Sequence, residues 1–143
     1  MKRRTLVTSF SLAMLGLSGC AAFDDAESQT ENTRLQSVEV ANRTDQRYRV
    51  NVLVFYEDEL QTWTSVDAGP MDEDSGEAGG GPVENTWPDE PGQFTVHARI
   101  DGKDSWQTLD LSEATGAECS PVVATIDYRG LRLWAGQSCP EDE

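Results

Sequence analysis

Apolar and polar residues alternate with a period of two over several short segments of this chain, a pattern typical of β-strands. The clearest segment is residues 47–56, where every second side chain from Tyr48 to Tyr56 is apolar or aromatic. The same pattern predicts further strands at residues 37–41, 60–66, 94–100, 105–111, 122–128 and 131–135. Turn-forming residues separate these segments, and the only helical structure predicted is one turn after Ser112.

About seven short strands within roughly 100 residues predict an all-β fold class, an immunoglobulin-like antiparallel β-sandwich over residues 37–140. The run PGQFTVHARIDG, residues 91–102, resembles a strand and turn of many extracellular sandwich modules. The chain lacks the Cys, Trp and Cys spacing of true immunoglobulin domains, since Cys119 and Cys139 flank one predicted hairpin. A small open β-barrel is the alternative architecture.

Asp101-Gly102 gives the strongest hairpin signal, because both residue types suit a tight turn. The register of the returning strand, residues 105–111, depends on the loop length, since a slip of one residue exchanges the two faces. We expect a loop of about two or four residues, which buries the leucines of that strand beside Phe94. This register leaves Trp106 beside His97.

Residues 67–92 interrupt the strand pattern with eight acidic residues, six glycines, four prolines and no basic residue. They predict a long loop that contains Trp87 and one short strand near residues 83–86. The acidic run at residues 72–77 invites a calcium interpretation, but Gly76 stands where an EF-hand needs a ligand. A looser cation site and a solvated acidic loop stay open as alternatives, and we assign no metal ligand and no cofactor.

Three basic residues, Lys2, Arg3 and Arg4, precede an uncharged run over residues 5–19, a combination typical of a signal peptide. The run is too short to cross a bilayer, which takes about 20 apolar residues. Arg3 and Arg4, followed by Thr-Leu-Val, resemble the twin-arginine export signal, a receptor-read address for substrates that travel folded. An ordinary secretory signal is the alternative.

Leu17-Ser18-Gly19-Cys20 ends this run and resembles the lipobox of bacterial and archaeal lipoproteins. The resemblance implies that cleavage leaves Cys20 first and that its sulfur carries a lipid. A diacyl-type lipid brings two chains, which are enough for stable attachment. Residues 20–36 are polar and acidic and predict a flexible tether. We therefore expect the domain to lie outside the cytoplasm, anchored to the outer face of the cell membrane.

The full chain carries 26 acidic and 11 basic residues, a formal net charge of −15. Loss of residues 1–19 removes three basic residues and no acid, so the mature chain carries −18. Such a chain repels nucleic acid, whose phosphates bind clustered Lys and Arg. Dispersed acids and the presence of only one lysine, Lys103, in the mature chain favour adaptation to high salt over a cation-binding surface. With its signal and lipobox, the chain resembles a haloarchaeal exported lipoprotein.

Lipidation of Cys20 leaves Cys119 and Cys139, which should form a disulfide in an oxidising exterior. The last two strands predict a hairpin that turns near Arg129-Gly130. If the turn centres on Arg129, the two cysteines face each other across the ladder, within disulfide range. Closing a loop of about 20 residues stabilises the fold by roughly 3 kcal/mol.

Few residues offer catalytic chemistry. His97 is the only histidine, so the common zinc sites are not available, and no serine lies in a nucleophile elbow. We interpret His97 as a surface residue or, with Trp87 and Trp106, as part of a shallow binding surface for a sugar or a protein. Asn42-Arg43-Thr44 is a glycosylation sequon in a predicted turn, so Asn42 is a candidate glycosylation site.

These features favour a non-enzymatic, lipid-anchored β-sandwich that binds a protein or glycan partner at the cell surface. Two alternatives stay open. One is an accessory or assembly subunit of another exported protein. The other is a hydrolase of an extracellular polymer that works through carboxylates, for which the sequence offers many acids but singles out no pair.

Overall fold

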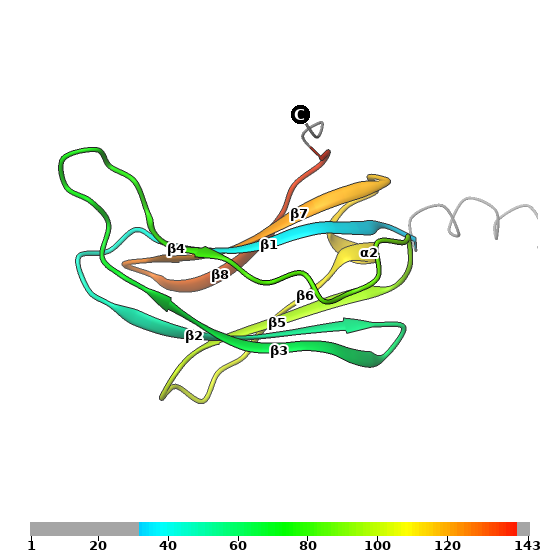
Figure 1. The fold of residues 1–143 in the computed structure, drawn as a ribbon, viewed down its shortest axis with the longest axis horizontal. Helices are drawn as coiled ribbons and strands as arrows, with labels where there is room; N and C mark the ends of the chain where they lie inside the picture. Colours follow the sequence, from blue (N-terminus) through cyan, green and yellow to red (C-terminus); the bar gives the residue numbers. More distant parts are fainter. Residues whose placement is uncertain (1–31, 140–143) are drawn as a thin grey trace, which may run out of the picture.

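The structure, a computed structural model, describes residues 32–139. Two four-stranded sheets pack face to face and form a β-sandwich (Figure 1). In chain order the elements are β1 (Arg34–Asn42), β2 (Tyr48–Tyr56), β3 (Glu59–Ala68), β4 (Gly79–Pro82), β5 (Phe94–Ile100), β6 (Gln107–Asp110), α2 (Leu111–Ala114), β7 (Cys119–Asp127) and β8 (Gly130–Ala135). The predicted all-β sandwich is confirmed, with eight described strands instead of about seven.

The two sheets are named here after their central strands. The β1 sheet has the strand order β4-β1-β7-β8, and the β2 sheet has the order β3-β2-β5-β6. Five of the six ladders are antiparallel, and the sixth pairs β1 with β7 in parallel. The first and the second-last strands therefore lie side by side, which ties the two ends of the described chain together.

Alternate residues of the central strands face inward and form the core. Val50, Val52 and Val54 of β2 are fully buried, as the period-two pattern predicts. Burial of one such side chain stabilises the fold by about 1.5–3 kcal/mol. Other core side chains come from both sheets, from the β4–β5 loop and from the short helix: Leu35, Val38, Trp87, Phe94, Val96, Ile100, Leu111, Val122 and Ile126.

The last residues of the predicted tether belong to a strand instead. Residues 34–36 belong to β1, and the side chain of Leu35 is 1% exposed. Arg34 pairs with Cys119 of β7, and its N–H donates to the carbonyl of Glu118 at 2.9 Å. Backbone pairing with a strand far along the sequence, which no local pattern reveals, makes these residues part of the sandwich.

The short strand in the long loop lies earlier than predicted. It is β4, over the glycines, not residues 83–86, and it pairs with residues 39–42 of β1. Gly80 has a φ of +109°, and a Cβ there would lie 2.2 Å from the carbonyl oxygen of Val40. The glycines therefore permit a close approach of two backbones that other residues would prevent.

The side chains of β5 and β6 lie on the predicted faces of the sheet, but the loop between the two strands is longer than predicted. Val96 pairs with Leu109 and His97 with Thr108, and the last pair before the loop is Ala98 with Gln107. The loop of two or four residues is therefore wrong, since residues 99–106 lie beyond that last pair. Their number is even, so the faces of the returning strand are those predicted.

The loops gather at two ends of the sandwich. The described chain enters at one end, beside the β2–β3 turn (Figure 1). The opposite, distal end carries the β1–β2 turn, the β3–β4 loop and the β7–β8 turn. This arrangement leaves the broad outer faces of both sheets along the sides of the molecule.

Candidate binding surface

The outer face of the β2 sheet carries a group of aromatic and aliphatic side chains, which we call the aromatic face. One row across the four strands runs Trp63, Leu53, His97 and Thr108, because each of these residues pairs with the next. Trp63 is 75% exposed. The other members are Leu60 (46% exposed), Phe55 and Trp106 (37% exposed). Exposed aromatic groups of this kind mark interaction sites more often than isolated surface residues do.

Trp106 is held in place by an arginine. The Arg99 Cζ atom lies 4.5 Å from the centroid of the Trp106 ring, a cation–π contact. The next residues on this face are polar, since Asn51 lies between Arg99 and Ser65 in the register. The Ser65 hydroxyl donates to Asn51 Oδ1 at 2.7 Å. The aromatic face thus places indole rings beside groups that donate and accept hydrogen bonds.

His97 is at the centre of this face and is half-buried. Its ring meets that of Phe55 edge to face, with 5.4 Å between centroids, and its Nδ1 atom lies 2.8 Å from Thr108 Oγ1. Partial burial lowers the pKa of His97 below its usual value of 6.5, because desolvation disfavours the imidazolium. At neutral pH the ring is therefore uncharged and adds apolar area to the surface.

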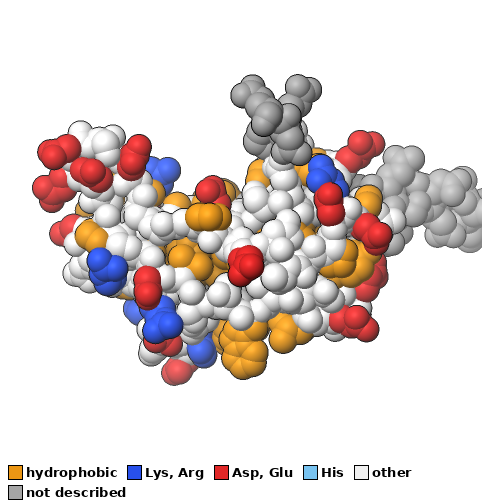
Figure 2. All heavy atoms as spheres, viewed as in Figure 1, with side chains coloured by type: hydrophobic (Ala, Val, Ile, Leu, Met, Phe, Trp, Pro, Cys, Tyr) orange, Lys and Arg blue, Asp and Glu red, His pale blue; other side chains and the backbone are white. Residues whose placement is uncertain are grey.

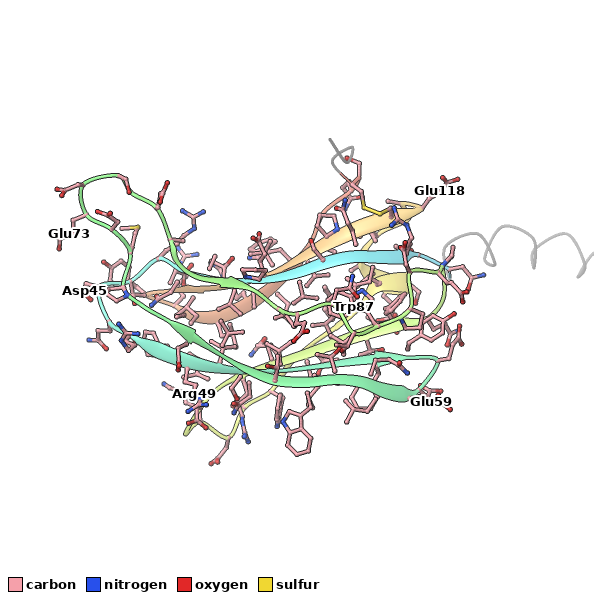
Figure 3. The ribbon with its side chains drawn as sticks, in the orientation of Figure 1. Asp45, Arg49, Glu59, Glu73, Trp87 and Glu118 are labelled. Atoms are coloured by element: carbon pink, nitrogen blue, oxygen red, sulfur yellow. A yellow bond between two sulfur atoms is a disulfide. The ribbon has the colours of Figure 1, made fainter. Side chains whose placement is uncertain are left out.

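The structure brings two of the three predicted surface residues together and removes the third. His97 and Trp106 share the aromatic face, although Trp106 lies across from Arg99 and not from His97. Trp87 is 5% exposed, and its Nε1 atom donates to the carbonyl of Leu35 at 2.9 Å. Figure 3 shows it between the sheets. The prediction that Trp87 lies on a binding surface is wrong, because its loop folds back over the open side of the core.

Trp63 is the surface residue that sequence reasoning did not select. The alternation along β3 already places it opposite Thr62, Thr64 and Val66. Thr62 is buried and Val66 packs against the core, so the indole must face solvent. Its neighbours in other strands, Leu53 and His97, could not be known before the register of β2 and β5 was known.

The outer face of the β1 sheet has one exposed indole. Trp134 of β8 is 54% exposed, and Arg132 lies 5.4 Å from its ring centroid. Its partner across the ladder is Val123. Glu39 in turn pairs with Val123, which places a carboxylate on this face. The β1 sheet therefore offers a single aromatic residue where the β2 sheet offers a group.

Asn42 does not fit the glycosylation prediction. Its side chain is fully buried, and its Nδ2 atom donates to the carbonyls of Gln46, Ala68 and Gly69. Its Oδ1 atom accepts from the backbone and hydroxyl of Thr44. A glycan is attached through Nδ2, so this fold has no room for one. The prediction of an accessible Asn42 is wrong, and the sequon instead forms a buried corner between β1 and β2.

The disulfide between Cys119 and Cys139 is confirmed, with Cα atoms 5.6 Å apart. The geometry differs from the prediction. The turn is the two residues Tyr128 and Arg129, and the β7–β8 ladder ends at Val122 and Ala135. The cysteines therefore lie beyond the paired part of the hairpin, and the bond fastens residues 136–139 to the start of β7.

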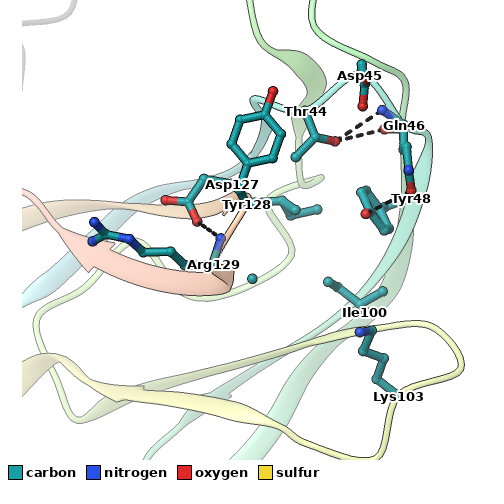
Figure 4. Close-up of a pocket in the computed structure, with 11 residues that line it drawn as sticks. Thr44, Asp45, Gln46, Tyr48, Ile100, Lys103, Asp127, Tyr128 and Arg129 are labelled. Atoms are coloured by element: carbon teal, nitrogen blue, oxygen red, sulfur yellow. Dashed lines mark hydrogen bonds between the residues drawn. The ribbon is translucent and has the colours of Figure 1, made fainter.

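A cavity of about 280 Å³ opens at the distal end, between the β1–β2 turn, the β7–β8 turn and the β5–β6 loop (Figure 4). Lys103 reaches toward this cavity, and no ion pair holds it among the described residues. The backbone N–H of Arg129 and the side chain of Arg132 bond to Asp127 and lower the pKa of that carboxyl. Ligand pockets usually measure about 300–1,000 Å³ and are mostly apolar. This cavity is smaller and mainly polar, so it is a weaker candidate for a binding site than the aromatic face.

Charge is unevenly spread over the visible surface. Figure 2 shows most of its basic groups toward the distal end, while acidic groups predominate at the end where the chain enters. The acidic β3–β4 loop projects from the distal end, as the position of Glu73 in Figure 3 shows. Asp72 Oδ1 in this loop accepts the N–H groups of Asp74 and Ser75, an ordinary turn. Within residues 32–139, no three His, Cys, Asp or Glu side chains group closely enough to hold a metal ion.

Several predicted residues lie outside the part of the chain that the structure describes. They are Cys20, Arg3 and Arg4, together with the rest of the signal peptide and the lipobox. The described residues contain no helix with the length and hydropathy that a membrane crossing requires.

Comparisons with known proteins add no relative. No protein-family model matches the chain, and neither a curated protein nor a solved structure matches it.

Proposed function

We propose that this chain is a lipid-anchored, extracytoplasmic binding module that holds a protein or glycan partner on its aromatic face. The single observation that carries the proposal is the row Trp63, Leu53 and His97 on the outer face of a sheet. Exposed aromatic and aliphatic side chains that lie together mark interaction sites on soluble proteins. Their burial against a partner would stabilise the complex by about 25 cal/mol per Å² of apolar surface.

The composition of the aromatic face suits partners with both apolar and polar groups. Indole rings supply large, rigid contact area with little loss of conformational entropy on binding. Ser65, Arg99 and Thr108 lie beside them and can exchange hydrogen bonds with a partner. A sugar ring, with apolar faces and hydroxyl edges, and a protein surface with an aliphatic patch both meet this description.

The proposed lipid anchor would leave the aromatic face free to bind a partner. Residues 20–31 would join Cys20 to the end of the sandwich at which residue 32 enters, so the sheets stand away from the attachment point. The two-chain lipid at Cys20 would keep the domain at the membrane without a transmembrane segment. Exchange of Cys20 for serine should release the protein from the detergent phase into the aqueous phase. Continued recovery with detergent would contradict the anchor.

The binding proposal is tested with substitutions that spare the core. Trp63→Ala combined with Trp106→Ala should lower partner recovery from solubilised membranes, or binding to cell-surface glycans, at least tenfold, because these exposed indoles are the largest anchors on the face. Trp134→Ala is the matched control, an exposed indole on the other sheet. Equal loss in the control, or no loss in the double variant, would contradict the proposal.

A further inference from the structure

The free edge of the β2 sheet at β3 is the longest sheet edge among the described strands. β3 spans ten residues, whereas the other edge strands, β4, β6 and β8, span four, four and six. It contains no proline and no lysine, two residues that commonly protect an edge from pairing. Such an edge is a template for a further strand.

The hydrogen bonds of β2 show which groups of β3 face outward. Arg49 accepts from the N–H of Asp101, and Glu57 donates to Gln93, so the odd residues of β2 bond toward β5. Its even residues then bond toward β3, where they pair with Thr62, Thr64 and Val66. The backbone groups of Trp63, Ser65 and Asp67 therefore point away from the sheet, and no described residue outside β3 bonds to them.

One part of this edge is covered. The hydroxyl of Thr86 donates to the carbonyl of Gln61 at 3.1 Å, so the loop before Trp87 closes the edge beside the β2–β3 turn. The chain leaves the strand after Ala68, at Gly69-Pro70. The open stretch is thus residues 63–67, with Ser65 at its centre.

We propose that this stretch pairs with the same stretch of a second copy of the chain, antiparallel and around a two-fold axis at Ser65. Ser65 then faces Ser65 of the second copy, and Trp63 faces Asp67. Each of these pairs exchanges both of its backbone hydrogen bonds. The outward backbone groups of Trp63 and Asp67 lie at equal distances on either side of Ser65, so a two-fold axis at Ser65 can pair them.

The charges on β3 and the availability of its backbone groups favour a two-fold axis at Ser65 over one at Trp63. A two-fold axis at Trp63 would place Asp67 opposite Glu59 and Ser65 opposite Gln61. Like charges directly opposite destabilise a strand pair, and the Gln61 carbonyl is already bonded to Thr86. In the Ser65 register, the exposed indole of Trp63 instead lies beside the Arg49–Asp67 ion pair of the second copy, which is 3.9 Å long and carries no net charge. The inference rests on the β3 backbone and not on the proposed lipid anchor or partner.

The first test removes the outward N–H without breaking the β2–β3 ladder. Proline is tolerated on an edge strand where its nitrogen faces outward. In the full-length chain with Cys20→Ser, we expect a dimer by light scattering at concentrations up to about 100 µM, where a micromolar Kd gives mostly dimer. Ser65→Pro should make it monomeric, with Kd raised at least tenfold. Ser65→Ala loses the same hydroxyl bond to Asn51 but keeps the N–H, and should stay dimeric. A monomeric parent chain, or a folded Ser65→Pro variant that still dimerises, overturns the proposal.

The second test measures which residues of the two β3 strands face each other, and it does not depend on folding of the proline variant. Facing residues of an antiparallel pair have Cα atoms about 5.5 Å apart, within disulfide range. In the same chain, Ser65→Cys should therefore form a covalent dimer under mild oxidation. Asp67→Cys is the control, because the two copies of residue 67 would lie about 14 Å apart along the strands. No covalent dimer with Ser65→Cys, or equal amounts with both variants, overturns the proposal.

Discussion

At the scale of single residues, Asn42 shows how a buried amide fixes a corner. Its side chain bonds the β1–β2 turn to the end of β3 through the carbonyls of Gln46, Ala68 and Gly69. Asn42→Ala should lower the free energy of unfolding by on the order of 3 kcal/mol, because it leaves several buried groups without partners. Asn85→Ala, at an exposed asparagine of the β4–β5 loop, is the control and should change little. Chemical unfolding measures both, and equal effects would contradict this role.

His97 gives a pH dependence with a definite sign. Its pKa is lower in the folded protein than in the unfolded chain, so the unfolded chain takes up the proton first as pH falls. The contribution of His97 to the free energy of unfolding is therefore fully present above the pKa of the unfolded chain, about 6.5. It decreases as the pH falls from there to the pKa of the folded protein. The effect is small, since the ring is only half-buried. His97→Gln should reduce the fall of the melting temperature between pH 7 and pH 5. If the melting temperature of the variant falls as steeply with pH as that of the parent protein, the assignment is contradicted.

Single residues were also the least predictable part of the candidate site. Trp87 sits in a Gly- and Pro-rich loop, a context that predicts exposure, yet the loop carries it into the core. Asn42 sits in a sequon, yet its amide is used by the backbone. In both cases the deciding partners are distant in sequence, so no local pattern could reveal them.

At the scale of elements, the disulfide compensates for a weak C-terminal end. Residues 136–139 lie beyond the β7–β8 ladder. Gly136 bonds to Pro121 and to the Ser120 hydroxyl, Gln137 accepts from Thr115, and the Cys119–Cys139 bond holds the end of the segment. Replacing both cysteines by serine should lower the free energy of unfolding by roughly 3 kcal/mol, because the unfolded chain gains the freedom of an open loop. Unfolding in denaturant measures this loss, and a change below about 1 kcal/mol would contradict the estimate.

The strands themselves were largely predictable, because period-two alternation follows directly from having one face in the core. β2 and β5 are the clearest examples, with buried and partly exposed residues in alternation over most of their length. The parallel pairing of β1 with β7 and the place of β4 were not predictable. Both depend on backbone contacts between distant segments, and β4 depends on glycines whose pattern indicates a loop.

At the scale of the whole molecule, the net charge predicts how stability depends on salt. The mature chain would carry −18, and the described residues form three ion pairs, none of them between two buried side chains. Repulsion among the remaining acids is screened at about 1 M salt, where the Debye length is about 3 Å. The melting temperature should therefore rise steadily from dilute to multi-molar NaCl. An unchanged melting temperature would contradict adaptation to high salt.

The central claim is that a partner binds the aromatic face of the β2 sheet, and site-specific photo-crosslinking in intact cells tests it most directly. A photoreactive amino acid at Thr108 lies in the row of Trp63 and His97, on β6 and away from the β3 edge. The same amino acid at Glu39 lies on the outer face of the β1 sheet. The account predicts adducts with another protein or with glycan at Thr108 and few at Glu39. Adducts at Glu39 alone, or at both positions equally, would contradict it.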